Sequence, residues 1–273
     1  MQHWYNYGPD KLSYFDQGKG STTILLIHGF GEDNEVWVNQ IEFLSKYFRI
    51  IAPNLPGVHC KPLTLPKNET PTISHYVEIL HALMHHLQIE QYYIMGHSMG
   101  GYIGLAFANY YTNHVQGLGL IHSTTYADNE LKKESRLKVA EFLEAFGTKK
   151  FLETATPNLF GNAFKMAHPK QVQKLIDRVS DISAEAMIQF VMAMYNRKAY
   201  THMLQQNNIP ILMVVGDADL AVSVEDSLAQ AKLLPSENVI LLEDVGHMGM
   251  LEAIEQVNQG ILNFIQTANS NHS

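Results

Sequence analysis

The chain has 273 residues and a net charge of −8, with no block of basic residues, so nucleic acid and anionic membrane surfaces are poor partners for it. Its single cysteine, Cys60, excludes an internal disulfide and is typical of a reducing compartment. No apolar run approaches the roughly 18 residues that cross a bilayer, and the first residues lack the pattern of a signal peptide. We therefore expect a cytoplasmic protein.

In the first half of the chain, short apolar runs alternate with segments of helical periodicity. The runs are too short for helices and are typical of strands; they lie at 11–16, 22–27, 48–52, 92–95 and 115–121. The segments with helical spacing are 36–47, 76–87 and 102–108. Strands that alternate with helices in this way predict a parallel sheet with crossover helices.

The alternation stops after this first half. Between 124 and 207 the apolar stripes have helical spacing only, and they are rich in Met and aromatic side chains. We predict a helical cap there, large enough to cover a pocket. Strand-like runs resume at 210–215 and 238–242, with a helix between them and a closing helix after them. The predicted organisation is core residues 1–123, cap residues 124–207 and core residues 208–273.

The sequence Gly96-His97-Ser98-Met99-Gly100 lies between a predicted strand and a predicted helix. Gly-x-Ser-x-Gly in that context is the pattern of a nucleophile elbow, a turn so tight that side chains at both glycines would collide with neighbouring backbone. Such a turn holds Ser98 out from the chain at a helix N-terminus, whose free N–H groups favour an oxyanion. The pattern alone occurs by chance in roughly one chain in ten of this length, so an ordinary strand-to-helix turn is the alternative.

Aspartate and histidine, two further residue types that take part in catalysis, follow later predicted strands. Asp217 and Asp219 follow one of them, and His247 follows the last. Because ligands bind at the carboxyl ends of the strands in open parallel sheets, we expect Ser98, one of these aspartates and His247 to meet there. A serine hydroxyl needs a base that takes its proton, and the base needs a carboxylate that orients it. The chain order Ser, Asp, His is the one that this architecture uses.

Together with His28-Gly29 after an early strand, these motifs make the chain resemble the α/β-hydrolase superfamily, in its capped, esterase-like branch. The resemblance covers essentially the full length. It implies an α/β fold with a mostly parallel sheet of about eight strands. Helices would flank this sheet, and the helical cap would be inserted late in it.

The resemblance also assigns roles to individual residues. Ser98 would be the nucleophile, and His247 the general base and then the general acid. The triad acid would be Asp219, with Asp217 as the runner-up. The oxyanion hole would consist of the backbone N–H groups of Phe30 and Met99.

Polar and flexible residues beside these motifs are candidates for the wall of a substrate pocket. They are His28, His97, His122 and Met248. For His28, bracing its own loop is the simpler interpretation.

The loop after the run at 48–52 departs from the Asp-x-x-Gly-x-Gly-x-Ser pattern of many relatives. Asn54 stands in place of the Asp, and His59 and Lys61 replace the second Gly and the Ser. His59 or Cys60 could contact substrate, although ordinary loop surface is the simpler interpretation. The shape of this loop is therefore open.

We predict a carboxylesterase-like serine hydrolase that cleaves a small, largely apolar ester, thioester or lactone through an acyl-enzyme on Ser98. We expect no cofactor and no metal, and a small-molecule substrate rather than nucleic acid or a membrane as the partner. The alternatives with the same triad are a carbon–carbon bond hydrolase and a perhydrolase. A hydrolase-fold ligand sensor with little turnover is a third alternative. The sequence leaves the oligomeric state open.

Overall fold

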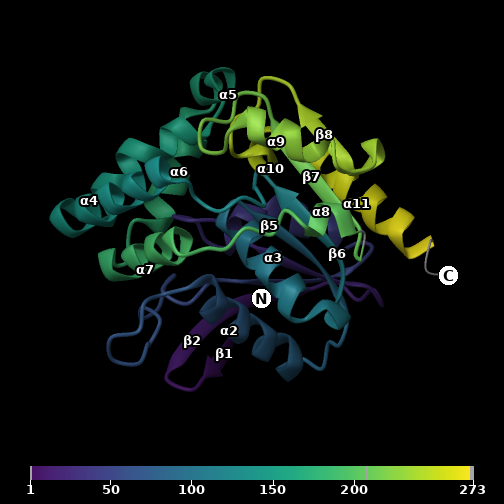
Figure 1. Cartoon of the computed structure of the whole chain (residues 1–273), viewed down its shortest axis with the longest axis horizontal. Helices are drawn as coiled ribbons and strands as arrows, with labels where there is room; N and C mark the ends of the chain where they lie inside the picture. Colours follow the sequence, from purple (N-terminus) through teal and green to yellow (C-terminus); the bar gives the residue numbers. More distant parts are fainter. Residues whose placement is uncertain (1, 207, 271–273) are drawn as a thin grey trace.

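The computed structural model describes residues 2–206 and 208–270 of the chain. Within these residues an eight-stranded sheet runs through the centre of the molecule (Figure 1), in the order β1-β2-β4-β3-β5-β6-β7-β8. Its strands are β1 (Gln2–Tyr7), β2 (Asp10–Gln17), β3 (Thr23–Ile27), β4 (Arg49–Pro53), β5 (Tyr92–His97), β6 (Val115–Ile121), β7 (Ile211–Gly216) and β8 (Val239–Leu242). The pairs β1–β2 and β2–β4 are antiparallel, and all the other neighbouring pairs are parallel. The predicted mostly parallel sheet is confirmed.

Strand β1 is the element that the sequence pattern misses. Its side chains are exposed except for Tyr5, which is partly buried. It pairs at the edge of the sheet with β2, where Tyr5 lies opposite Leu12. A strand that is open to solvent on most of its surface needs no apolar face, so its sequence lacks the alternation that marks a half-buried strand.

Helices flank the sheet, as predicted. They are α1 (Val38–Leu44), α2 (Ile73–His86), α3 (Met99–Tyr110), α9 (Val224–Ala231), α10 (Gly249–Glu252) and α11 (Ile254–Ser270). Helix α2 packs against α3, and α1 packs against α11, so these four helices form two separate pairs. In the described part of the chain, no helix is both long enough and apolar enough to span a bilayer.

Between β6 and β7 the described residues form helices and loops. The helices are α4 (Glu130–Ala155), α5 (Asn162–Ala167), α6 (Pro169–Val179), α7 (Ala184–Tyr195) and α8 (Met203–Gln206), with a short 3-10 helix, η3 (Thr156–Leu159). Helices α4 to α7 gather at one side of the sheet (Figure 1), and α4 packs along α7. Gly147, with φ of +77°, interrupts α4. The predicted cap boundary at residue 207 lies outside the described residues.

The register of the parallel strands brings their carboxyl ends to one edge of the sheet. Gly96 near the end of β5 lies opposite Ile27 at the end of β3, and Gly216 at the end of β7 lies opposite Leu242 at the end of β8. All six residues of β5 are buried, because helices cover both faces of a central parallel strand. Residues that follow these strands are therefore held close together.

Candidate active site

Ser98 occupies a strained turn between β5 and α3. Its φ of 50° and ψ of −114° lie in a region that side-chain-bearing residues rarely adopt. The turn depends on glycine on both sides. A Cβ atom at Gly96 would lie 2.3 Å from the carbonyl oxygen of Gly100, and one at Gly100 would lie 2.2 Å from that of Ile27. These contacts leave the Ser98 side chain projecting from the tip of the turn.

Asp219 and His247 follow β7 and β8 and contact each other directly. The distance between His247 Nδ1 and Asp219 Oδ2 is 2.8 Å, and both side chains are almost fully buried. The other carboxylate oxygen of Asp219 accepts hydrogen bonds from the backbone N–H groups of Ala221 and Val222. Although burial opposes it, the charge of His247 and the hydrogen bonds from His122 and His247 lower the pKa of Asp219 well below its usual range. Asp219 is therefore an anion that holds a proton on His247 Nδ1, while Asp217 is exposed.

His122 is a second neighbour of Asp219. Its Nδ1 lies 3.4 Å from Asp219 Oδ2, and its Nε2 accepts a hydrogen bond from the N–H of Gly249 at 3.2 Å. Burial lowers the pKa of His122 to about 4, so the ring is neutral at neutral pH with its proton on Nδ1. The contact with Asp219 is thus a long contact between a neutral ring and a carboxylate rather than an ion pair, and Nδ1 has no well-formed hydrogen bond among the described residues.

Among the described residues, His122, Asp219 and His247 also have potential ligand atoms within 4.8 Å of one another. A metal ion would need a lone pair on each histidine at the atom that faces it. The Nδ1 atoms that face Asp219 carry protons instead, as the contacts of both rings indicate. The donor set therefore fits a hydrogen-bonded cluster better than a metal site.

Glu32 and His97 form a buried ion pair behind the turn of Ser98. His97 Nδ1 lies 2.9 Å from Glu32, and His97 Nε2 donates to the backbone carbonyl of His247 at 2.8 Å. Both ring nitrogens face acceptors, so the ring is protonated. Although desolvation opposes it, Glu32 raises the pKa of His97. Glu32 also accepts from the N–H of Gly29 at 2.7 Å, which fixes the loop after β3.

A cavity of about 170 Å³ contains Ser98 and His247 in its wall. Most of the wall is apolar and comes from α4, η3, α7 and the loops after β3 and β7; these residues are Phe30, Val139, Phe151, Leu152, Leu159, Met194 and Val222. Lys132 and Arg136, one turn apart on α4, also line it. Neither cation was predicted from the sequence, although a spacing of four residues on a predicted helix indicates that both side chains lie on one face.

The four residues predicted for the pocket wall lie elsewhere. His28, His97, His122 and Met248 are all buried, and the structure places none of them in the wall of this cavity. The three histidines use their ring nitrogens within the protein; His28, for example, accepts from the N–H of Leu55 through Nε2. They lie behind the site because polar rings just after buried strands need polar partners there. Of the predicted oxyanion-hole residues, Phe30 lines the cavity and Met99 begins α3.

Comparison with known proteins decides the family. The sequence profile of the alpha/beta hydrolase fold family matches residues 22–254. The chain belongs to this family. The match runs from before β3 into α11 and agrees with the predicted resemblance.

This α/β hydrolase is similar to several known enzymes. A solved thermophilic esterase from Thermogutta terrifontis, with malate bound, has a TM-score of 0.88 and 27% identity, and the superposition covers 98% of this chain and 99% of that chain. Lipase 1 of Psychrobacter immobilis is 27% identical over 260 residues, which are 90% of this chain and 78% of that protein. The dihydrolipoyllysine-residue acetyltransferase component of the acetoin cleaving system of Pseudomonas putida is 28% identical over 261 residues. That match covers 93% of this chain and 66% of the relative.

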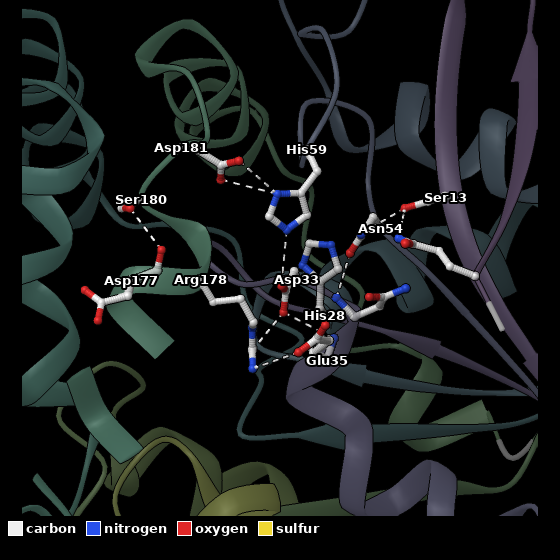
Figure 2. A network of polar contacts seen from close by, with 12 residues as sticks. Ser13, His28, Asp33, Glu35, Asn54, His59, Asp177, Arg178, Ser180 and Asp181 are labelled. Atoms are coloured by element: carbon white, nitrogen blue, oxygen red, sulfur yellow. Dashed lines mark hydrogen bonds and ion pairs between the residues drawn. The ribbon is translucent and has the colours of Figure 1, made fainter. Parts of the chain in front are cut away.

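In this hydrolase the loop that departs from the family pattern contacts the cap (Figure 2). His59 Nε2 lies 3.2 Å from Asp33, in the loop after β3, and its Nδ1 lies 3.2 Å from Asp181, between α6 and α7. Arg178 of α6 lies 2.8 Å from Asp33. Hydrogen bonds to Asp33 and Asp181 raise the pKa of His59, although partial burial opposes them. Neither His59 nor Cys60 lines the cavity of Ser98.

Proposed function

We propose that this α/β hydrolase is a serine hydrolase that cleaves a small ester, thioester or lactone through an acyl-enzyme on Ser98. The contact of 2.8 Å between His247 Nδ1 and Asp219 Oδ2, beside a cavity that Ser98 and His247 share, carries this proposal. A histidine whose Nδ1 proton is bound by a carboxylate has its lone pair on Nε2, where it can act as a base.

In the first half of the reaction, Ser98 Oγ attacks the acyl carbon while His247 Nε2 takes the hydroxyl proton. The backbone N–H groups of Phe30 and Met99 stabilise the negative charge on the former carbonyl oxygen. The N–H of Met99 suits this role because it lies in the first turn of α3, where N–H groups have no partner within the helix. The bond to the alcohol or thiol then breaks, and His247 gives that leaving group its proton.

In the second half, water attacks the acyl carbon of the ester on Ser98, and His247 takes a proton from this water. The bond to Ser98 Oγ breaks, His247 returns the proton to Oγ, and the free acid leaves. Asp219 remains an anion throughout, because its low pKa fits a group that stabilises the positive charge on His247 without accepting the proton.

The cavity supports a small substrate. A volume of about 170 Å³ accommodates a short acyl group, and the apolar wall favours carbon chains over a polyanion. Leu152 and Phe151 of α4 and Phe30 of the core lie in this wall, so the cap and the core both contribute to substrate size selection.

The first experiment measures steady-state hydrolysis of p-nitrophenyl esters from acetate to octanoate by the wild-type protein and by Ser98→Ala. We expect the highest kcat/KM with the shorter esters and loss of turnover in the variant. Labelling of Ser98 by a fluorophosphonate tests the nucleophile independently of turnover. Labelling without turnover favours a carbon–carbon bond hydrolase or a sensor, and the absence of both contradicts the proposed triad.

A further inference from the structure

Two cations lie in the same cavity wall as the proposed nucleophile. Lys132 and Arg136 of α4 line the cavity that Ser98 and His247 line. They are four residues apart, so both side chains lie on one face of the helix. Two cations beside a mostly apolar wall are unfavourable unless a ligand or another part of the protein supplies negative charge to them.

Arg136 shares its carboxylate partner with a second guanidinium group, and Lys132 has no ion pair among the described residues. Asp128 Oδ2 contacts Arg136 Nε at 3.1 Å, while Asp128 Oδ1 contacts Arg197 at 2.6 Å, so two guanidinium groups share one carboxylate. Among the described contacts, the Lys132 ammonium donates to one group, the carbonyl of Ala221 at 3.0 Å. That oxygen carries no formal charge.

Three other acidic groups lie nearby. Asp219 attracts Lys132, but it contacts His247 and does not line the cavity. Glu32 lines the cavity but is paired with protonated His97. Asp226 lines an adjoining hollow of about 310 Å³ that Lys132 also lines, and its side chain is exposed to solvent. Lys132 and Arg136 therefore face the cavity, while Asp128 and Asp219, the carboxylates that attract them, lie outside its wall.

The surroundings make an anionic ligand favourable. The Arg136 and Arg197 side chains are only 15% and 6% exposed, and Arg197 stacks on Tyr102 at 4.1 Å from the ring centroid. Desolvation together with repulsion from Arg136 lowers the pKa of Lys132. Cations that are partly removed from water attract a counter-charge more strongly than cations in bulk solvent. The Lys132 side chain remains accessible, so a ligand can reach it.

We propose that the substrate carries a carboxylate that Lys132 and Arg136 bind, so that the preferred substrates are small esters with one free carboxylate. This inference rests on the proposed function. It refines the expectation of a largely apolar substrate, because the apolar wall contacts the short carbon chain while the cations bind its charged end. Lys132 supplies a point charge, and Arg136 supplies N–H groups beyond the Nε that contacts Asp128.

Two matched pairs of esters test the proposal. In each pair one member has a free carboxylate, and in the other member this carboxylate is converted to a methyl ester. Monomethyl succinate and dimethyl succinate differ by a methyl group on the acyl side. Acetoxyacetate and its methyl ester differ in the same way on the alcohol side. We expect kcat/KM, followed by proton release at constant pH, to be at least about tenfold higher for the anionic member of at least one pair, since a partly buried charged contact contributes about this factor.

The variants Lys132→Met and Arg136→Met keep apolar volume and remove the charge. Each variant should lower kcat/KM for the preferred anionic ester about tenfold, mainly by raising KM. The kcat/KM for the neutral analogue should change by less than about threefold. Lys133→Met, which removes the neighbouring charge that pairs with Glu130, should leave both values unchanged. Equal losses with both esters would mean that Lys132 merely ties α4 to the loop of Ala221, and would overturn the proposal.

Binding to Ser98→Ala separates this inference from the proposed function. Calorimetric titration of that variant with each ester needs no turnover. Tighter binding of the anionic member, lost when Lys132→Met is added, supports the carboxylate site even if the wild-type protein hydrolyses neither ester. Hydrolysis of all four esters with no preference for the anionic members, and equal binding, would leave the hydrolase proposal intact and overturn the carboxylate site.

Discussion

His97 donates a hydrogen bond from its Nε2 to the backbone carbonyl of His247 over 2.8 Å. The same ring contacts Glu32 through Nδ1, and Glu32 holds the N–H of Gly29. One buried ion pair thereby connects the loops after β3, β5 and β8. These loops supply the proposed oxyanion donor, nucleophile and base, so His97 and Glu32 are positioning residues rather than groups that contact substrate.

Removing the Glu32 charge should destabilise the protein. Glu32→Gln leaves His97 as a buried cation without its anion, which costs about 3 kcal/mol of the free energy of unfolding. Urea unfolding measures this loss, and kcat should fall with little change in KM. Glu35→Gln is the matched control because Glu35 is half exposed, and it should change the free energy of unfolding by less than about 0.5 kcal/mol. Equal stability of the two variants would contradict a structural ion pair.

The two aspartates after β7 should differ sharply in their effect on activity. Asp219→Asn removes the anion that keeps the proton on His247 Nδ1, and kcat should fall by about 10³- to 10⁴-fold. Asp217→Asn alters an exposed side chain two residues away and should leave kcat within about twofold. Ester hydrolysis by both variants checks this. A large loss in Asp217→Asn alone would make Asp217 the triad acid.

The contact between His59 and the cap should depend on pH. Because its pKa is raised on folding, His59 stabilises the protein fully below its ordinary pKa of about 6.5, and this stabilisation is lost as pH rises through the raised value. The pKa of Asp33 is lowered by the hydrogen bond from His59, although burial opposes it. Its carboxylate therefore stays charged until the solution is strongly acidic.

We therefore expect His59→Gln to lower the free energy of unfolding by about 1 kcal/mol near pH 6 and by less near pH 9. Hydrogen exchange of the segment that contains Arg178 and Asp181 should become faster in the wild-type protein as pH rises, after correction for the intrinsic pH dependence of exchange. The difference between wild type and His59→Gln should shrink over the same range. A difference that is independent of pH would show that the charge of His59 does not stabilise the contact.

Gly100 should tolerate no side chain. A Cβ atom there would lie 2.2 Å from the carbonyl oxygen of Ile27, in a central strand that cannot move without disturbing the sheet. Gly100→Ala should abolish esterase activity and lower the free energy of unfolding by more than about 3 kcal/mol. Gly8→Ala is the control, since Gly8 has φ of +55° but open space around it, and should cost only about 1 kcal/mol. Thermal unfolding of both variants compares the two costs.

The sequence by itself determined the central strands, the turn of Ser98 and the helical character of the segment between β6 and β7. Strand β6 occupies 115–121, as predicted, and the tight turn of Ser98 lies between Gly96 and Gly100, as predicted. These features could be predicted because their causes are local. Burial on both faces produces a continuous apolar run, and a tight turn requires glycine at fixed positions.

The tertiary structure decided which of these residues meet. Asp217 and Asp219 both follow β7, and the preference for Asp219 came from the family resemblance alone; the contact itself exists because the packing of the loop after β8 brings His247 to Asp219. That Lys132 and Arg136 line the cavity of Ser98 depends on how α4 packs against the rest of the molecule. Contacts between residues far apart in the chain follow from the packing of whole elements, because each side chain takes the partners that the assembled sheet and cap bring within reach.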